Sequence, residues 1–124
     1  MNDREYILIV DDNPTNLKLV TYLLKLEGYA TRQADSAEAA LQIIREEVPV
    51  LLLLDVQLPD MDGLDLVRLL KAEERTKSFP IVALTACAMK EDEEKAYAAG
   101  FDGYITKPID TRNLLLLVAD YLKK

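Results

Sequence analysis

Three short apolar runs, each followed at once by a polar residue, constrain the fold of this chain more than any other feature of its sequence. Continuous apolar runs of about five residues are typical of strands that are buried on both faces, as in a parallel sheet. We therefore expect three central strands whose carboxyl ends each present a polar side chain. The runs and the polar residues after them are 6–10 with Asp11, 50–54 with Asp55, and 80–84 with Thr85.

Helical patterns alternate with these runs and with two weaker strand candidates, 29–34 and 103–106. Gly28 and Gly100 follow two of the helical patterns, where glycine commonly ends a helix. Asp35 stands three residues before Glu38, which is the spacing of a capping box with Asp35 as the N-cap. Strand and helix alternate five times, which predicts an α/β fold with a parallel sheet and helices on both faces. The expected helices are 15–27, 37–47, 64–74, 91–99, and 110 or 111 to 122.

The length and charge of the chain narrow the classes of function. A length of 124 residues fits one domain, and we expect residues 1–124 to form it. The 15 basic and 22 acidic residues give a net charge of -7, which argues against nucleic acid and against an anionic membrane surface as partners. We see no signal peptide and no apolar run of about 20 residues, so a cytoplasmic setting is expected.

Missing residue types exclude several kinds of chemistry. The chain has no histidine, which excludes Ser-His and Cys-His catalysis and zinc–histidine sites within it. Cys87 is the only cysteine, so no disulfide can form within the chain.

Five polar residues are expected at one edge of the sheet, because the carboxyl ends of parallel strands lie together and ligands bind there. They are Asp11, Asp12, Asp55, Thr85 and Lys107. Two carboxylates about 4 Å apart repel by roughly 4 kcal/mol at an effective dielectric near 20, so a proton or a cation must offset their charge. Oxygen ligands favour Mg²⁺, and a carboxylate can attack phosphorus to form an aspartyl phosphate. Lys107 and Mg²⁺ would stabilise the charge, and the Thr85 hydroxyl could donate to a phosphate oxygen.

Each of these residues also has an ordinary structural explanation. Asp11 and Asp12 could cap the helix that follows them. Asp55 could simply begin a loop, Thr85 could end a strand, and Lys107 could belong to a turn before proline, with a trans or a cis bond. The coincidence of all five at strand ends favours the functional interpretation.

Four segments make the chain resemble the receiver domain of two-component response regulators over nearly its whole length. The resemblance implies a doubly wound, five-stranded (βα)5 sheet in the order 2-1-3-4-5, with helices on both faces. Segments 12–16 and 86–90 are most similar to receivers attached to hybrid kinases and to small stand-alone regulators. The four matching segments are 7–12, 54–63, 83–86 and 103–108.

The resemblance implies a role for each residue at the sheet edge. Asp55 would be the phosphoacceptor. Asp12 would bind Mg²⁺ directly, Asp11 would bind it mainly through water, and the Gln57 backbone carbonyl would be a further ligand beside Asp55. Lys107 would pair with the phosphate.

The resemblance also implies a conformational switch. Thr85 would close onto the phosphate, and Tyr104 would turn inward on activation, although a half-buried strand tyrosine needs no such role. Segment 87–94 and the helix after it would move. Gln57 and Cys87 occupy positions that influence how fast the acyl phosphate hydrolyses.

The expected partners follow from the same resemblance. A histidine kinase or a histidine phosphotransfer protein would donate the phosphoryl group, a downstream protein would read it, and phosphorylation could also form a homodimer. The apolar turn 114–118 is too broad for one buried helix face, so we expect part of it to be exposed for docking. The chain would not be an enzyme beyond its own phosphorylation and dephosphorylation.

Two alternatives from other classes stay open. One is a Mg²⁺-dependent hydrolase with an aspartyl-phosphate intermediate, of the haloacid dehalogenase type. Such enzymes usually carry a second aspartate where this chain has Gln57, which argues against this alternative. The other is a constitutive interaction module that is never phosphorylated.

Overall fold

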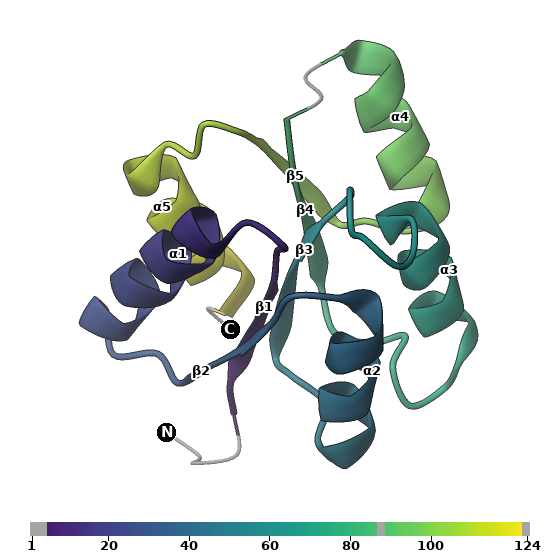
Figure 1. Cartoon of the computed structure of the whole chain (residues 1–124), viewed down its shortest axis with the longest axis horizontal. Coiled ribbons are helices and arrows are strands. Elements are labelled where there is room, and N and C mark those ends of the chain that lie inside the picture. The colour runs from purple at the N-terminus through teal and green to yellow at the C-terminus, as the bar shows by residue number, and fades with distance from the viewer. Residues whose placement is uncertain (1–4, 87–88, 123–124) are drawn as a thin grey trace.

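The three apolar runs form the central strands of a parallel sheet. In the computed structural model, which describes residues 5–86 and 89–122, the sheet has five strands in the order β2-β1-β3-β4-β5 (Figure 1). This confirms the doubly wound parallel sheet and the strand order that the resemblance implied. The strands are β1 (Ile7–Val10), β2 (Thr31–Ala34), β3 (Leu51–Asp55), β4 (Ile81–Thr85) and β5 (Gly103–Thr106).

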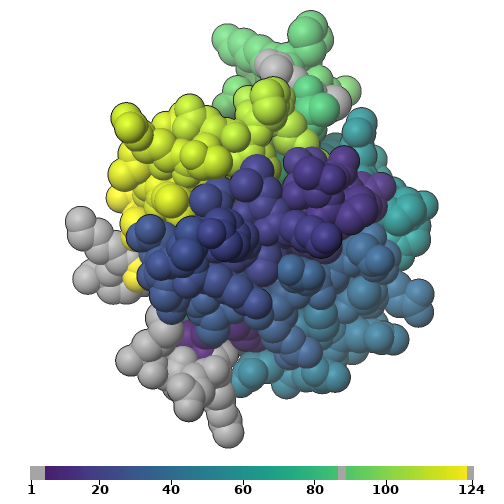
Figure 2. Space-filling view, turned by 60° about the vertical axis from the view of Figure 1, so that its left-hand side comes forward, coloured from purple at the N-terminus to yellow at the C-terminus, as the bar shows by residue number. Residues whose placement is uncertain are grey.

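Helices cover both faces of the sheet. Figure 1 shows α1 and α5 on one face and α2, α3 and α4 on the other. Figure 2 shows α1, in purple and blue, beside α5, in yellow, on the outside of the first face. The helices begin and end within two residues of the expected positions, and they are α1 (Pro14–Leu26), α2 (Ala37–Glu46), α3 (Gly63–Ala72), α4 (Lys90–Ala99) and α5 (Thr111–Leu122).

Burial on both faces explains why the central strands are apolar throughout. Along β3, Leu52 and Leu54 pack into the core under α2, α3 and α4. The alternate residues Leu51 and Leu53 pack into the core under α1 and α5. All four side chains are fully buried, and burying a leucine contributes roughly 1.5–3 kcal/mol. A polar residue therefore interrupts such a strand only at its end, where Asp55 stands.

The N-terminus of α2 differs from the expectation. Ser36 is its N-cap, and the Ser36 side chain accepts a hydrogen bond from the Ala39 N–H at 3.1 Å. The prediction that Asp35 caps this helix in a capping box was therefore wrong by one residue. The Ala37 and Glu38 N–H groups donate instead to Asp60, which belongs to the loop between β3 and α3. This long-range contact is invisible to a local capping rule.

The other helix ends follow local rules. The Asn13 side chain caps α1 by accepting from the Thr15 and Asn16 N–H groups, so neither Asp11 nor Asp12 is the N-cap. Asp110 likewise accepts from the second and third residues of α5, which decides between the two expected starts of this helix, 110 and 111. Gly100 ends α4 with φ at +125°, a conformation that is strained for residues with a side chain. Because Asn13 is the N-cap of α1, the capping explanation for Asp11 and Asp12 is excluded.

The apolar turn of α5 is only partly buried. Leu114 and Val118 are fully buried against the sheet, whereas the Leu116 side chain is 62% exposed. Leu115 and Leu117 pack at the margin of the same core. The expected partial exposure of this turn is therefore confirmed.

Among the helices of residues 5–86 and 89–122, we find none with both the length and the apolarity that crossing a membrane requires.

Candidate functional site

The candidate site lies at the carboxyl edge of the sheet. Asp55 is the last residue of β3 and Thr85 is the last residue of β4. Asp11 directly follows β1, and Lys107 directly follows β5. The Lys107 N–H donates to the Thr85 carbonyl at 2.7 Å, which continues the pairing of β4 and β5 beyond the last strand residues. The parallel register therefore brings all of these residues to one edge.

Three aspartates form a compact acidic cluster there. Asp11, Asp12 and Asp55 each place one carboxylate oxygen within 4.8 Å of the others. Asp11 and Asp55 are buried, with 1% and 4% of their surface exposed, while Asp12 is exposed. The expectation that the three carboxylates meet is thus confirmed, and the exposed Asp12 leaves the cluster open to solvent on one side.

Lys107 places its ammonium between the two buried carboxylates. The Lys107 Nζ atom lies 3.0 Å from Asp11 Oδ2 and 3.1 Å from Asp55 Oδ2. The other oxygens are held by the loops, because Asn13 N–H donates to Asp11 Oδ1 at 2.9 Å and Gln57 N–H donates to Asp55 Oδ1 at 3.0 Å. Each buried carboxylate is therefore oriented by one backbone N–H and one ammonium.

Burial, hydrogen bonds and neighbouring charges together shift the pKa values of Asp55 and Lys107. Burial raises the pKa of Asp55, and the neighbouring Asp11 charge adds to the increase, while the Gln57 N–H and Lys107 act against it. Burial alone would lower the pKa of Lys107, but its hydrogen bonds and charge interactions with Asp11 and Asp55 outweigh burial and leave that pKa raised. One ammonium thus offsets only part of the charge of three carboxylates.

The residues of the cluster fit a hard divalent cation. Within the described part of the chain, the buried Asp11 Oδ2 has the Lys107 ammonium as its partner, and Asp55 Oδ2 shares that ammonium. One ammonium balances at most one of the two buried charges, so a further cation would offset the rest. An all-oxygen donor set with one exposed carboxylate suits Mg²⁺, which takes few protein ligands and keeps several waters. The cluster is therefore a chemically suitable magnesium site.

The other residues that the sequence predicted for the site are Thr85, Gln57, Tyr104 and Cys87. Thr85 is buried at the end of β4, next to the strand that carries Asp55. Tyr104 is half-buried on β5, and its ring centre lies 6.4 Å from that of Tyr97 on α4. Gln57 is exposed directly beyond the cluster, and Cys87 lies outside the described residues. Thr85, Lys107 and Gln57 thus border the carboxylates, whereas Tyr104 lies at the boundary between β5 and α4.

Sequence reasoning assigned no role to Asp60. Its carboxylate joins the loop after β3 to the N-terminus of α2. The only local signal was the position of Asp60. It follows Pro59 and stands too far before the next helix to cap it.

Comparisons with known proteins agree with this geometry. A family model described as response regulator receiver domain matches residues 7–119. The polar-differentiation response regulator DivK of Brucella ovis is 40% identical over 116 residues, which cover 94% of each chain. The chemotaxis response regulator CheY4 of Vibrio cholerae has a similar structure, with a TM-score of 0.89 and 26% identity over 95% of this chain and 98% of its own.

One similar structure contains a metal ion. It is the receiver domain of a sensor histidine kinase from Pseudomonas aeruginosa PAO1, with magnesium coordinated in its active-site cleft. Its TM-score is 0.88, with 29% identity over 97% of this chain and 98% of its own. The fold, the acidic cluster and these similarities lead to one conclusion. This chain belongs to the response regulator receiver domain family, a family of phosphoacceptor signalling switches in two-component systems.

Proposed function

We propose that Asp55 accepts a phosphoryl group from a phosphohistidine donor, and that this reaction requires Mg²⁺. The observation that carries the proposal is the carboxylate of Asp55 itself, which ends a buried strand within reach of Lys107 and two further aspartates. In the reaction, an Asp55 oxygen forms a bond to phosphorus while the bond from phosphorus to the donor nitrogen breaks. The electron pair of the broken bond stays on the donor imidazole.

Residues around Asp55 orient it for this attack. The Gln57 N–H fixes one carboxylate oxygen, and the Lys107 ammonium lies beside the other. Asp11, Asp12, Asp55 and the Gln57 backbone carbonyl would hold Mg²⁺, which supplies positive charge to the oxygens of the transferring group. Lys107 stabilises the same charge from the β5 side.

Phosphorylation then acts as a switch. A phosphoryl group adds about -2 charge and strong acceptor oxygens, which favour conformers in which Thr85 and Lys107 contact it. Moving a two-state population from 1:99 to 99:1 needs about 5.5 kcal/mol, which a few charge-assisted hydrogen bonds can supply. Tyr104 packs beside α4 through Tyr97, so a change at Thr85 would be transmitted to the surface of α4, β5 and α5.

That surface is where we place a downstream protein partner. Leu116 and Met89 are both largely exposed there. The proposed phosphoryl donor is a histidine kinase or a histidine phosphotransfer protein, in a cytoplasmic setting. We also propose that phosphorylation can form a homodimer. Gln57 and Cys87 are proposed to influence the lifetime of the phosphoryl group rather than its formation.

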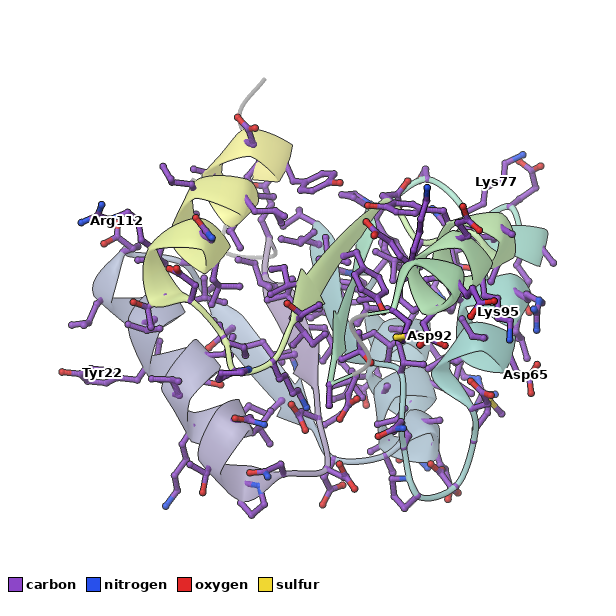
Figure 3. The ribbon with its side chains drawn as sticks, turned by 90° about the horizontal axis from the view of Figure 1, so that it is seen from above. Tyr22, Asp65, Lys77, Asp92, Lys95 and Arg112 are labelled. Carbon is purple, nitrogen blue, oxygen red and sulfur yellow. The ribbon has the colours of Figure 1, made fainter. Side chains whose placement is uncertain are left out.

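Intact mass spectrometry tests the phosphoacceptor directly. The protein is incubated with acetyl phosphate, with Mg²⁺ or with EDTA. We expect the mass of one phosphoryl group to be added only with Mg²⁺, and not to Asp55→Asn. Asp65→Asn is the matched control, because Asp65 is an exposed aspartate on α3, labelled in Figure 3, that pairs with Arg68 and is not one of the three clustered aspartates.

The two alternative functions give different results. A Mg²⁺-dependent hydrolase would show no lasting adduct and, given a phosphate monoester with Mg²⁺ in a parallel incubation, would release inorganic phosphate continuously. A constitutive interaction module would gain no mass under any Mg²⁺ condition. An adduct on Asp55→Asn would show that another residue is the phosphoacceptor.

A further inference from the structure

The loop between β3 and α3 is attached to a helix to which it is not adjacent in sequence. Asp60 Oδ1 accepts from the Ala37 N–H at 2.9 Å, and Asp60 Oδ2 accepts from the Glu38 N–H at 3.0 Å. Both carboxylate oxygens of this loop residue are therefore bound to the first turn of α2.

This contact does more than cap α2. The helix has its own N-cap in Ser36, whose side chain accepts from the Ala39 N–H. Glu38 is exposed, so water could replace Asp60 as the partner of its N–H, whereas Ala37 is buried and has less access to water. What water could not replace is the attachment of the loop to α2.

The same loop leads away from the proposed phosphoacceptor. Its base is held on the α3 side, because the Gly63 N–H donates to the Val56 carbonyl at 2.7 Å and Gln57 forms a bridge with Asp62. Its first residues include Gln57, whose N–H orients the Asp55 carboxylate. Asp60 lies farther along the loop and provides its attachment to α2.

We propose that Asp60 is a positioning residue, which ties the loop to the N-terminus of α2 and thereby holds the Gln57 backbone in the geometry needed at Asp55. The inference rests on the proposed function, since it gives Gln57 a place beside the Mg²⁺ site and the phosphoacceptor. Both oxygens of the Asp60 carboxylate accept hydrogen bonds from α2, and Asp60 is not among the three clustered aspartates, so it would act through the loop.

The charge state of Asp60 is consistent with this role. The hydrogen bonds from Ala37 and Glu38 lower the pKa of Asp60, so its carboxylate is ionised at neutral pH and both oxygens are acceptors. A negative charge at a helix N-terminus also interacts favourably with the helix dipole. The attachment is therefore intact under the conditions in which phosphorylation is measured.

Three variants separate loop positioning from helix capping. Asp60→Ala removes both hydrogen bonds, whereas Asp60→Asn keeps one acceptor oxygen. Ser36→Ala is the matched control, because it removes a cap from the same helix and leaves the loop attached. The first readout is the Mg²⁺ concentration that gives half-maximal phosphorylation by acetyl phosphate. The second is hydrogen exchange of the Gln57 amide in the metal-free protein, which requires no phosphorylation.

We expect Asp60→Ala to raise the half-maximal Mg²⁺ concentration by about threefold to tenfold, which is less than the roughly 10- to 100-fold cost of losing a direct outer-shell partner, because Asp60 acts through the loop. Its Gln57 amide should exchange faster by a similar factor, Asp60→Asn should lie between, and Ser36→Ala should match the wild type. Wild-type behaviour of Asp60→Ala in both readouts would overturn the inference. Equal effects of Ser36→Ala and Asp60→Ala would also overturn it, because the effect would then come from the helix. If the wild type gained no phosphoryl group, the proposed function would fail, and amide exchange would still decide the role of Asp60.

Discussion

The Lys107 ammonium lies 3.1 Å from Asp55 Oδ2, although 52 residues separate the two in sequence. It also lies 3.0 Å from Asp11 Oδ2, so it offsets the charge of two buried carboxylates at once. This arrangement makes Lys107 important both for the stability of the metal-free site and for the charge of a bound phosphoryl group.

We expect Lys107→Met, which keeps the apolar stem and removes the charge, to lower the free energy of unfolding by about 1–3 kcal/mol without Mg²⁺, because two buried acceptors lose their cation. Mg²⁺ should restore part of that loss by supplying positive charge at the same carboxylates. Urea unfolding with Mg²⁺ and with EDTA measures both effects. Lys77→Met, at an exposed ion pair with Glu74, should change stability by less than about 1 kcal/mol, and equal effects of the two variants would contradict the prediction.

Stability should depend on pH through Asp60. Its pKa is lowered in the folded state from the ordinary value of 3.8 by the hydrogen bonds from Ala37 and Glu38. Its contribution is therefore fully present above pH 3.8 and is lost as the pH falls through the lower folded-state pKa. We expect the wild type to be more stable than Asp60→Ala at pH 7, with a smaller difference at pH 3. Urea titrations across this range test it, and a difference that grew on acidification would have the wrong sign.

The leucines of α5 should separate stability from partner binding. Leu114→Ala should lower the free energy of unfolding by roughly 2–5 kcal/mol, because the side chain is fully buried. Leu116→Ala should change it by less than about 0.5 kcal/mol, because 62% of that residue is exposed.

Leu116→Ala should at the same time leave phosphorylation intact and weaken binding of the downstream partner. Leu115→Ala, at the half-buried margin of the core, should lower stability and also weaken partner binding. Denaturation and phosphorylation assays establish the first part, and binding of the phosphorylated protein to its partner establishes the second. Unfolding of Leu116→Ala would mean that the side chain belongs to the core and is not available for docking.

The contact between the β3–α3 loop and α3 should tolerate no added methyl group at Gly63. A Cβ there would lie 2.7 Å from Val56 Cα and 2.8 Å from the Val56 carbonyl oxygen, so backbone would have to move. We expect Gly63→Ala to cost about 1–3 kcal/mol of stability and to slow phosphorylation of the neighbouring Asp55. Thermal unfolding and intact mass measure the two effects, and a variant with wild-type stability would show that the loop yields easily.

Much of the fold was predictable because its signals are local. Continuous apolar runs indicated strands covered on both faces, and the three central strands lie within one residue of those runs. Asn13 and Asp110 cap helices whose first residues follow them directly, which also depends on neighbours in sequence. The convergence of Asp11, Asp55 and Lys107 was predictable as well, since parallel strands end at one edge.

The sequence by itself thus determined the elements, the parallel sheet and the residues at its carboxyl edge. Only the tertiary structure decided that Lys107 lies between Asp11 and Asp55, and that Ser36 rather than Asp35 caps α2. The physical reason is range. A strand or a local cap depends on side chains a few positions apart, whereas the ammonium of Lys107 and the carboxylate of Asp60 meet partners 52 and 23 residues away, where loop paths decide the contact.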